Sequence, residues 1–394
     1  MILTDKQKQG LKEIIARYKN GEKYVVVAGW AGTGKTTLVK FAIEALGVDA
    51  EDVVYAAYTG KAAEVLRKKG NKNAMTLHKL LYRFFMEDGY FRKVPKKDIG
   101  YKVVVIDEIS MITKDMMDLL LSHDCFVICL GDPFQLPPVS KKESNDLLDK
   151  PHIFLDEIMR QAKESEIIRL SMDLREMKPL TLFSGKEVQI IDKKDLSTGM
   201  LLWADQTIVA TNQTRNFINQ KTRELLGFTK ELEKEDKIIC CHNYWDKIDD
   251  FGMAPLINGS AGTIEEIEKI NVRPPIRVRQ TMKNKEYEAY KVTFTSFVGE
   301  MYSDILLDTA YLTNNKETLE WLDTKKLYRQ RNPFKYIPLS FNYGYAITCW
   351  KAQGSEWDKV LILEENFPFQ REEHYRYLYT ALTRASQKAV LIKN

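Results

Sequence analysis

The segment from Gly29 to Thr37 reads GWAGTGKTT and combines closely spaced glycines with one lysine and hydroxyl side chains. A glycine, four residues and then Gly-Lys-Thr form the phosphate-loop pattern, in which backbone N–H groups turn inward around phosphates. Lys35 would reach the β- and γ-phosphates, and the Thr36 hydroxyl would complete the coordination of Mg²⁺. We therefore expect a nucleoside triphosphate to be bound by Gly29, Ala31, Gly32, Thr33, Gly34, Lys35, Thr36 and Thr37.

Two acids, Asp107 and Glu108, follow the apolar run 103–106. An apolar strand that ends in two acids is common by itself, but it gains meaning about seventy residues after a phosphate loop. Asp107 would hold Mg²⁺ through water, and Glu108 would polarise the attacking water as a general base. Thr36 and Asp107 are thus the expected metal-binding residues.

The elements that must position these residues form an alternating pattern in the first 150 residues. Apolar runs read as strands and are separated by two helical patterns, 35–46 and 61–68. This alternation predicts a parallel sheet with helices on both faces. The runs lie at 24–28, 53–57, 103–106 and 126–130. Residues 131–139, GDPFQLPPV, would then emerge at the carboxyl edge of the sheet, where Gln135 would sense the γ-phosphate.

A second α/β pattern starts near residue 151 and returns in the strands 359–363 and 389–392. Between 236 and 340 the chain changes to short β-like pieces with turns, which predicts an inserted antiparallel barrel or sheet. Within 81–101, Asp-Gly stands between two aromatic arms and predicts a β-hairpin. We expect an α/β protein with two domains, 1–150 and 151–394, that carry these two insertions.

Composition narrows the class of protein. The 394 residues are 44% hydrophobic and 29% charged, with no apolar run long enough for a membrane helix. The polar N-terminus has no signal-peptide core, so we expect a cytoplasmic protein. Five cysteines without a CxxC pair argue against disulfides and zinc, so residues 240–242, Cys-Cys-His, are read as ordinary thiols beside a histidine. The formal charge of +4 permits a nucleic-acid partner without requiring one.

Nine short blocks of sequence, spread along the chain in the expected order, resemble the superfamily 1 helicases and within them the RecD-like branch. The acids are followed by Ile109 and Ser110, and Leu-Pro-Pro follows Gln135. The UvrD-like branch instead carries Asp-Glu-x-Gln-Asp and lacks the Leu-Pro-Pro. The resemblance covers nearly the whole chain, in the blocks 3–7, 29–37, 59–63, 76–81, 107–110, 131–139, 160–161, 351–354 and 379–385.

The resemblance implies two RecA-like domains, with an SH3-like β-barrel as the insertion in the second. It also implies that Arg160 and Arg384 reach ATP from the second domain to stabilise charge on the transferred phosphoryl group. Gln7 would select adenine with a bidentate hydrogen bond. Each arginine could instead be an exposed surface residue, the common fate of this side chain.

The resemblance further implies DNA contacts in both domains. His78 could instead be a buried histidine, and Trp350, where relatives commonly have histidine, could stack on a base or only pack. The aromatic residues of the hairpin, Phe85 among them, could meet a duplex fork or only pack within the hairpin. The expected contacts are Thr59, Lys61, Thr76, His78, Phe85, Thr348, Trp350 and Gln353.

The expected function is an ATP- and Mg²⁺-dependent 5′-to-3′ DNA helicase, whose polarity comes from the resemblance alone. We expect a monomer that acts on single-stranded DNA and on single-strand/duplex junctions, with replication or repair proteins as partners and no membrane. One alternative is a P-loop ATPase that binds DNA as a switch or clamp without processive unwinding. A nuclease or transferase is disfavoured because the sequence offers no further acid block for a second metal.

Overall fold

The computed structural model describes residues 3–87, 90–137, 145–159, 162–252, 254–276, 286–308, 312, 335–366 and 370–394. The chain divides into two compact units. The first contains residues 1–81, 96–211 and 347–394, and the second contains 82–95 and 212–346. Among the described residues, no helix is long and apolar enough to cross a membrane.

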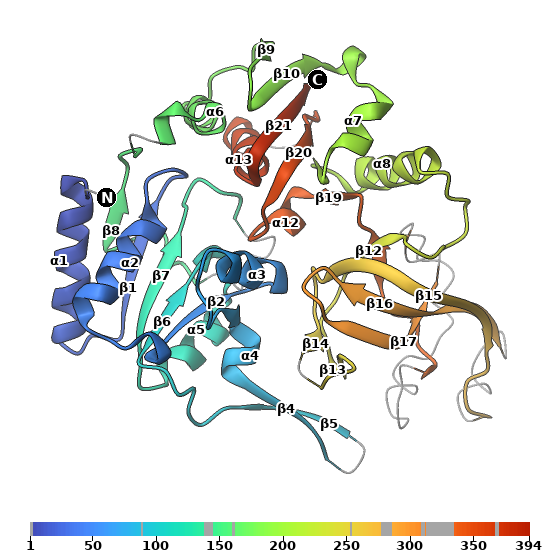
Figure 1. The fold of residues 1–394 in the computed structure, drawn as a ribbon, viewed down its shortest axis with the longest axis horizontal. Helices are drawn as coiled ribbons and strands as arrows, with labels where there is room; N and C mark the ends of the chain where they lie inside the picture. The colour runs from blue at the N-terminus through green and yellow to red at the C-terminus, as the bar shows by residue number, and fades with distance from the viewer. Residues whose placement is uncertain are drawn as a thin grey trace. The chain divides into compact units, whose positions relative to one another are not determined.

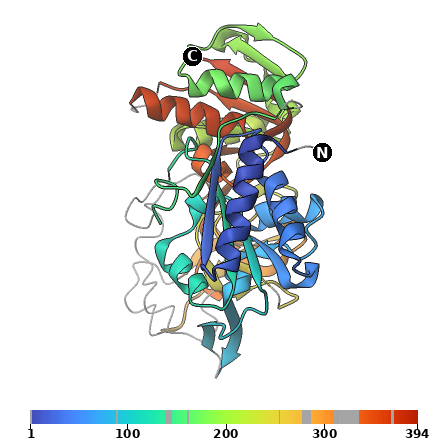
Figure 2. The same cartoon turned by 90° about the vertical axis from the view of Figure 1, so that its left-hand side faces the viewer.

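The first unit contains a six-stranded sheet in the order β3-β2-β6-β7-β1-β8, in which every neighbouring pair is parallel (Figure 1). Its strands are β1 (Tyr24–Gly29), β2 (Val53–Ala57), β3 (Met75–Thr76), β6 (Val103–Ile106), β7 (Phe126–Gly131) and β8 (Ile153–Leu155). Its helices are α1 (Asp5–Lys19), α2 (Lys35–Leu46), α3 (Gly60–Lys68), α4 (Leu77–Leu81) and α5 (Lys114–Leu121), with 3₁₀ turns η1 (Ala50–Asp52) and η2 (Ile109–Met111). Figure 2 views the fold from the side of α1, which packs along β1 and β8.

A second six-stranded sheet of the same unit has the order β19-β11-β20-β21-β10-β9. It is parallel from β11 to β10, and β9 pairs antiparallel at the edge. Its strands are β9 (Phe183–Ser184), β10 (Val188–Asp192), β11 (Gln206–Val209), β19 (Ala346–Thr348), β20 (Trp357–Leu363) and β21 (Ala385–Lys393). Its helical segments are η4 (Ala162–Glu164), α6 (Glu166–Arg175), η5 (Lys193–Asp195), α7 (Thr198–Trp203), α12 (Cys349–Ala352) and α13 (Arg371–Leu382).

The second unit is built on a five-stranded antiparallel sheet in the order β17-β16-β15-β12-β18. Phe294, Tyr302 and Phe341 are fully buried in its core. The unit also contains helix α8 and two two-stranded ladders. Its elements are α8 (Asn212–Leu225), β12 (Lys237–Cys240), β13 (Tyr244–Ile248), β14 (Pro255–Leu256), β15 (Ala261–Val272), β16 (Tyr287–Ser296), β17 (Met301–Leu307), β18 (Phe341–Tyr343) and the hairpin β4 (Tyr82–Glu87) and β5 (Tyr90–Pro95).

The structure confirms the expected α/β class, with two largely parallel sheets and an antiparallel insertion. The hairpin forms with Glu87 opposite Tyr90, and its expected Asp-Gly tip, 88–89, lies outside the described residues. Strand β8 lies beyond residue 150 and still pairs with β1, so the first sheet extends past the expected domain boundary.

Candidate nucleotide site

The loop between β1 and α2 has a backbone that only glycine adopts easily. Gly34 is the N-cap of α2 with φ 77°, in the left-handed region, and no side chain caps that helix end. A Cβ on Gly29 would lie 2.7 Å from the carbonyl oxygen of Leu155, so a larger residue would collide with the backbone of β8. Since the first N–H groups of a helix lack intrahelical partners, this end of α2 suits an anion.

The Lys35 side chain folds over the phosphate loop and contacts its first two residues. Its Nζ donates to the carbonyl oxygens of Gly29, at 2.6 Å, and of Trp30, at 3.1 Å. The Thr33 hydroxyl also donates to Trp30 O, at 2.8 Å. Thr36, in the first turn of α2, is exposed. The loop is therefore held in a closed turn, with its lysine ammonium and its threonine hydroxyl on the same segment.

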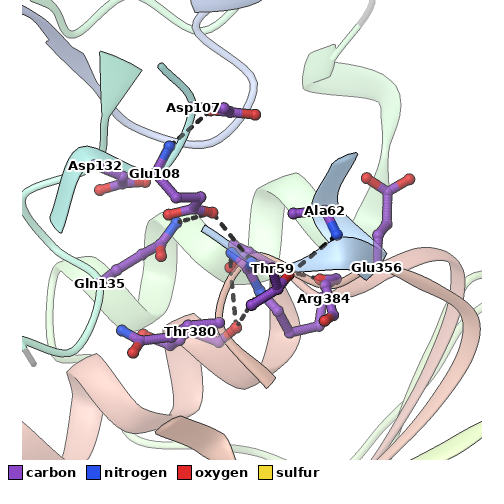
Figure 3. A network of polar contacts seen from close by, with 12 residues as sticks. Thr59, Ala62, Asp107, Glu108, Asp132, Gln135, Glu356, Thr380 and Arg384 are labelled. Carbon is purple, nitrogen blue, oxygen red and sulfur yellow. Dashed lines mark hydrogen bonds and ion pairs between the residues drawn. The ribbon is translucent and has the colours of Figure 1, made fainter. Parts of the chain in front are cut away.

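Asp107 and Glu108 follow β6, as the sequence predicts. The backbone N–H of Glu108 donates to Asp107 Oδ1 at 3.1 Å (Figure 3). Burial raises the pKa of the Asp107 carboxyl, and the neighbouring Glu108 raises it further, whereas Lys35 opposes the shift. Glu108 itself has φ 56°, an uncommon conformation for a residue other than glycine. A cation beside Asp107 would favour its charged form, so the site fits a bound metal.

Three expected catalytic residues meet at the Glu108 carboxylate (Figure 3). Its Oε1 accepts from Arg384 Nη1 at 3.1 Å and from Gln135 Nε2 at 3.3 Å. Gln135 follows β7 of the first sheet, whereas Arg384 belongs to the second. Burial alone would lower the pKa of the Arg384 guanidinium, but the Glu108 charge outweighs it and the pKa is raised. The two sheets therefore contribute to one site.

The two arginines expected to reach the nucleotide, Arg160 and Arg384, differ in how far the structure describes them. Arg384 lies in the turn between α13 and β21, because α13 ends at Leu382. Arg160 lies outside the described residues, so its expected contact with a nucleotide stays a prediction.

Gln7 is buried against the phosphate loop. Its Oε1 accepts from the N–H of Thr4 at 3.0 Å, which forms a capping box at the start of α1. Its Nε2 donates to Thr33 O at 3.2 Å. Both ends of the amide are thus engaged within the chain, and adenine recognition by Gln7 stays a prediction.

The expected DNA contacts of the first sheet lie at helix starts. Thr59 is the N-cap of α3 and accepts from Ala62 N at 3.1 Å, with the partly buried Lys61 beside it. The Thr76 hydroxyl accepts from Lys79 N at 3.2 Å, at the start of α4. His78 is 5% exposed and packs edge-on against Tyr58, with ring centroids 5.7 Å apart. This geometry favours the buried reading of His78 that the sequence left open.

Two of the expected DNA contacts, Trp350 and Gln353, are bonded to the loop that follows β7. Trp350 Nε1 donates to Pro137 O at 3.2 Å, and Gln353 Nε2 donates to Leu136 O at 2.6 Å. Both bonds join α12 and the residue after it to the loop that follows β7. Thr348 is the N-cap of α12 and is partly buried. Phe85 of the hairpin is 42% exposed and open to a partner.

Comparison with known proteins gives matches in both halves of the chain. A family described as an AAA domain matches residues 2–194, and the UvrD-like helicase C-terminal domain matches residues 343–392. The ATP-dependent DNA helicase dda of Enterobacteria phage T4 is 34% identical over 150 residues, which is 36% of this chain and 34% of that protein. The ATP-dependent RecD2 DNA helicase of Deinococcus radiodurans is 27% identical over 405 residues, 97% of this chain and 49% of that protein.

The chain belongs to the superfamily 1 helicases. Its place is in the branch that holds the Pif1, RecD and Dda helicases. The alignments cover half or less of the two relatives' own lengths. Among solved structures, Pif1 helicase from Bacteroides in complex with ADP-AlF3 and ssDNA is 20% identical, with a TM-score of 0.49, over 99% of this chain and 92% of that chain.

In this superfamily 1 helicase, one feature of the site was missed from the sequence. Tyr379, on α13, accepts from Ala31 N at 2.8 Å and donates to Asp132 Oδ2 at 2.5 Å. Asp132 is part of the block that supplied Gln135, and Tyr379 opens the block that supplied Arg384. The phenol hydroxyl of Tyr379 was the available signal, because a buried Tyr hydroxyl needs a hydrogen-bond partner, but the sequence does not identify that partner.

Proposed function

We propose that this chain is an ATP-dependent DNA helicase that moves 5′ to 3′ along single-stranded DNA and unwinds duplexes. The main support for this proposal is that Gln135, which follows a strand of the first sheet, and Arg384, which precedes a strand of the second, both donate hydrogen bonds to Glu108 Oε1. A hydrolytic site built from two α/β sheets lets ATP turnover alternate with movement between them. The relatives' names, ATP-dependent DNA helicases, support the same conclusion.

In this proposal the phosphate loop binds ATP, with Lys35 on the β- and γ-phosphates. Glu108 orients the attacking water and accepts its proton, and Gln135 reports on the γ-phosphate. Arg384 stabilises the charge that develops on the transferred group, and Arg160 is expected to add a second cation. Thr36 and Asp107 would hold Mg²⁺, which supplies positive charge to the phosphates when bound.

We further propose that the two parallel sheets are RecA-like domains and that the antiparallel sheet is an SH3-like insertion. The strand would be gripped at Thr59, Thr76 and Thr348, where helix starts offer N–H groups and hydroxyls to phosphates. The hairpin would part the duplex, with Phe85 as its described exposed aromatic residue. Solved Pif1 structures with single-stranded DNA and with forked duplex DNA support this choice of ligand for the chain.

A tailed-duplex assay tests the proposal. The chain, ATP and Mg²⁺ are mixed with duplexes that carry a 5′ or a 3′ single-stranded tail, and strand release is followed over time. We expect release from the 5′-tailed duplex, and none with Lys35→Ala. Preference for a 3′ tail would reject the assigned polarity. ATP hydrolysis without release from either substrate would favour the alternative, a DNA-binding switch or clamp.

A further inference from the structure

The hydroxyl of Tyr379 stands between two loops of the first sheet. The N–H of Ala31 in the phosphate loop donates to Tyr379 Oη at 2.8 Å, and Oη donates to Asp132 Oδ2 at 2.5 Å. The other carboxylate oxygen of Asp132 accepts from Phe134 N at 3.0 Å. One side chain of α13 thus joins the phosphate loop to the loop after β7.

The direction of these hydrogen bonds follows from chemistry. A backbone N–H can only donate, so Tyr379 Oη must accept from Ala31 and direct its own proton to Asp132. Burial, and then the Asp132 charge, raises the pKa of the Tyr379 hydroxyl, which therefore stays protonated. Tyr379 is 0% exposed and Asp132 is 3% exposed, so loss of either hydrogen bond would leave a buried polar group without water to replace its partner.

The same end of α13 makes further contacts with the loop after β7. The Thr380 hydroxyl accepts from Leu136 N at 2.8 Å, and Arg376 Nη1 donates to Pro133 O at 2.7 Å. Arg384 follows in the turn after α13, and its Nε donates to Thr380 O at 3.1 Å (Figure 3). The anchor formed by Tyr379 and Thr380 is thus bonded to the arginine that contacts Glu108.

The beginning of the phosphate loop is held from the second sheet at another point. The Arg175 guanidinium of α6 lies 3.4 Å from the centroid of the Trp30 ring. Phe154 packs edge-on against the same ring, with centroids 5.2 Å apart. Trp30 and Ala31 are adjacent, so α6 and α13 of the second sheet contact neighbouring residues of the phosphate loop.

We propose that Tyr379 is a positioning residue that acts through Arg384. Its hydroxyl docks the end of α13 on the phosphate loop and on Asp132, and this docking sets the Arg384 guanidinium against Glu108. The inference rests on the proposed ATP-hydrolysing function. It assigns Tyr379 no contact with the nucleotide, so its effect belongs to turnover and not to ATP affinity.

The test compares Tyr379→Phe with Tyr377→Phe, a matched control on the same helix. Tyr377 is also fully buried, and its hydroxyl donates to Leu363 O at 2.6 Å within the second sheet. We expect Tyr379→Phe to lower kcat for ATP about tenfold or more, since two buried groups lose their partner. The Kd for ATP should change less than about threefold, and Tyr377→Phe should leave kcat within about twofold. An equal fall in kcat for both variants, or a weaker affinity for ATP with kcat unchanged, would overturn the proposal.

A double-mutant cycle with Arg384→Ala separates positioning from general damage. If Tyr379 acts through Arg384, the double variant turns over ATP no more slowly than Arg384→Ala alone. Multiplying effects would overturn the proposal. Should Tyr379→Phe fail to fold, as judged by thermal unfolding, Thr380→Val removes the next hydroxyl of the anchor and enters the same cycle with the same criterion.

The wild-type control distinguishes this inference from the proposed function. If single-stranded DNA does not stimulate ATP hydrolysis by the wild type, the proposed motor fails. The cycle is then run on hydrolysis without DNA, where non-additive effects still support the role of Tyr379 and additive effects still reject it.

Discussion

At the scale of single residues, Asp107 lies where its charged form is disfavoured. Its side chain is partly buried at the end of β6, beside Glu108, and both the burial and the neighbouring charge raise its pKa. Burying a charged carboxylate without a cation costs free energy, and a bound metal would offset that cost. The acid pair was predictable because an apolar strand led directly into it.

This burial predicts a pH-dependent gain in stability for Asp107→Asn. Below the unfolded-state pKa, about 3.9, the wild-type carboxyl is neutral in both states and contributes no difference. As pH rises through the higher folded-state pKa, the folded wild type must hold a buried charge and loses stability. We expect metal-free Asp107→Asn to melt a few degrees above wild type at pH 8, with the gap closing towards pH 4.

The control is Asp124→Asn, since the Asp124 side chain is fully exposed and 3.8 Å from Lys23. Thermal unfolding of both variants across this pH range checks the prediction. A gap for Asp107→Asn that widens as pH falls would contradict it.

Glu108 carries the second prediction at this scale. Glu108→Gln keeps the shape of the side chain but removes the carboxylate that accepts a proton from water in the proposed function. We expect kcat for ATP to fall by about two to four powers of ten while the Kd for ATP stays near that of wild type. Steady-state hydrolysis and equilibrium nucleotide binding measure the two separately. Loss of binding in proportion to kcat would assign Glu108 to affinity and not to turnover.

At the scale of elements, long apolar runs were predictable and short ones were not. The runs at 24–28 and 103–106 became β1 and β6 because a strand buried on both faces is apolar throughout. The three-residue β8 and the two-residue β9 are too short to show a period. The contacts of Tyr379 and Gln7 were also hidden, because they join residues far apart in the sequence.

Helix α8 is tied to the start of the antiparallel insertion by a buried ion pair. Arg223 Nε and Nη2 bind the two carboxylate oxygens of Asp236, each at 2.8 Å. The side chains are 5% and 0% exposed. Arg223 Nη1 also donates to Thr229 O at 2.8 Å, so one guanidinium contacts two points of the segment that joins α8 to β12.

We predict that Arg223→Leu destabilises the chain by about 3–5 kcal/mol, because it leaves Asp236 buried without its cation. Urea unfolding followed by tryptophan fluorescence measures the change. Lys221→Ala on the same helix removes only an exposed pair with Glu224 and should cost less than about 1 kcal/mol. Equal costs for the two variants would show that the buried pair has no special weight.

At the scale of the whole molecule, the chain combines a candidate nucleotide site in the first unit with a hairpin that is assigned to the second unit. The hairpin leaves and returns at adjacent residues, since Lys96 N donates to Leu81 O at 2.8 Å. Residues 82–95 can therefore be replaced by two glycines with little strain on the first sheet. Among the hairpin side chains that the structure describes, the exposed aromatic ring of Phe85 suits contact with a partner.

We predict that this replacement separates the two activities. Hydrolysis of ATP with single-stranded DNA should stay within about threefold of wild type, because the nucleotide site lies in the first unit. Release of a strand from a 5′-tailed duplex should fall about tenfold or more. Unwinding at the wild-type rate would remove the hairpin from the mechanism.

The proposed coupling between ATP turnover and DNA is measured by the rate of ATP hydrolysis with and without single-stranded DNA. We expect saturating single-stranded DNA to raise kcat for ATP about tenfold or more, and Lys35→Ala to abolish hydrolysis under both conditions. ATP turnover by the wild type at the same rate with and without DNA would contradict the claim that this chain is a DNA-driven motor.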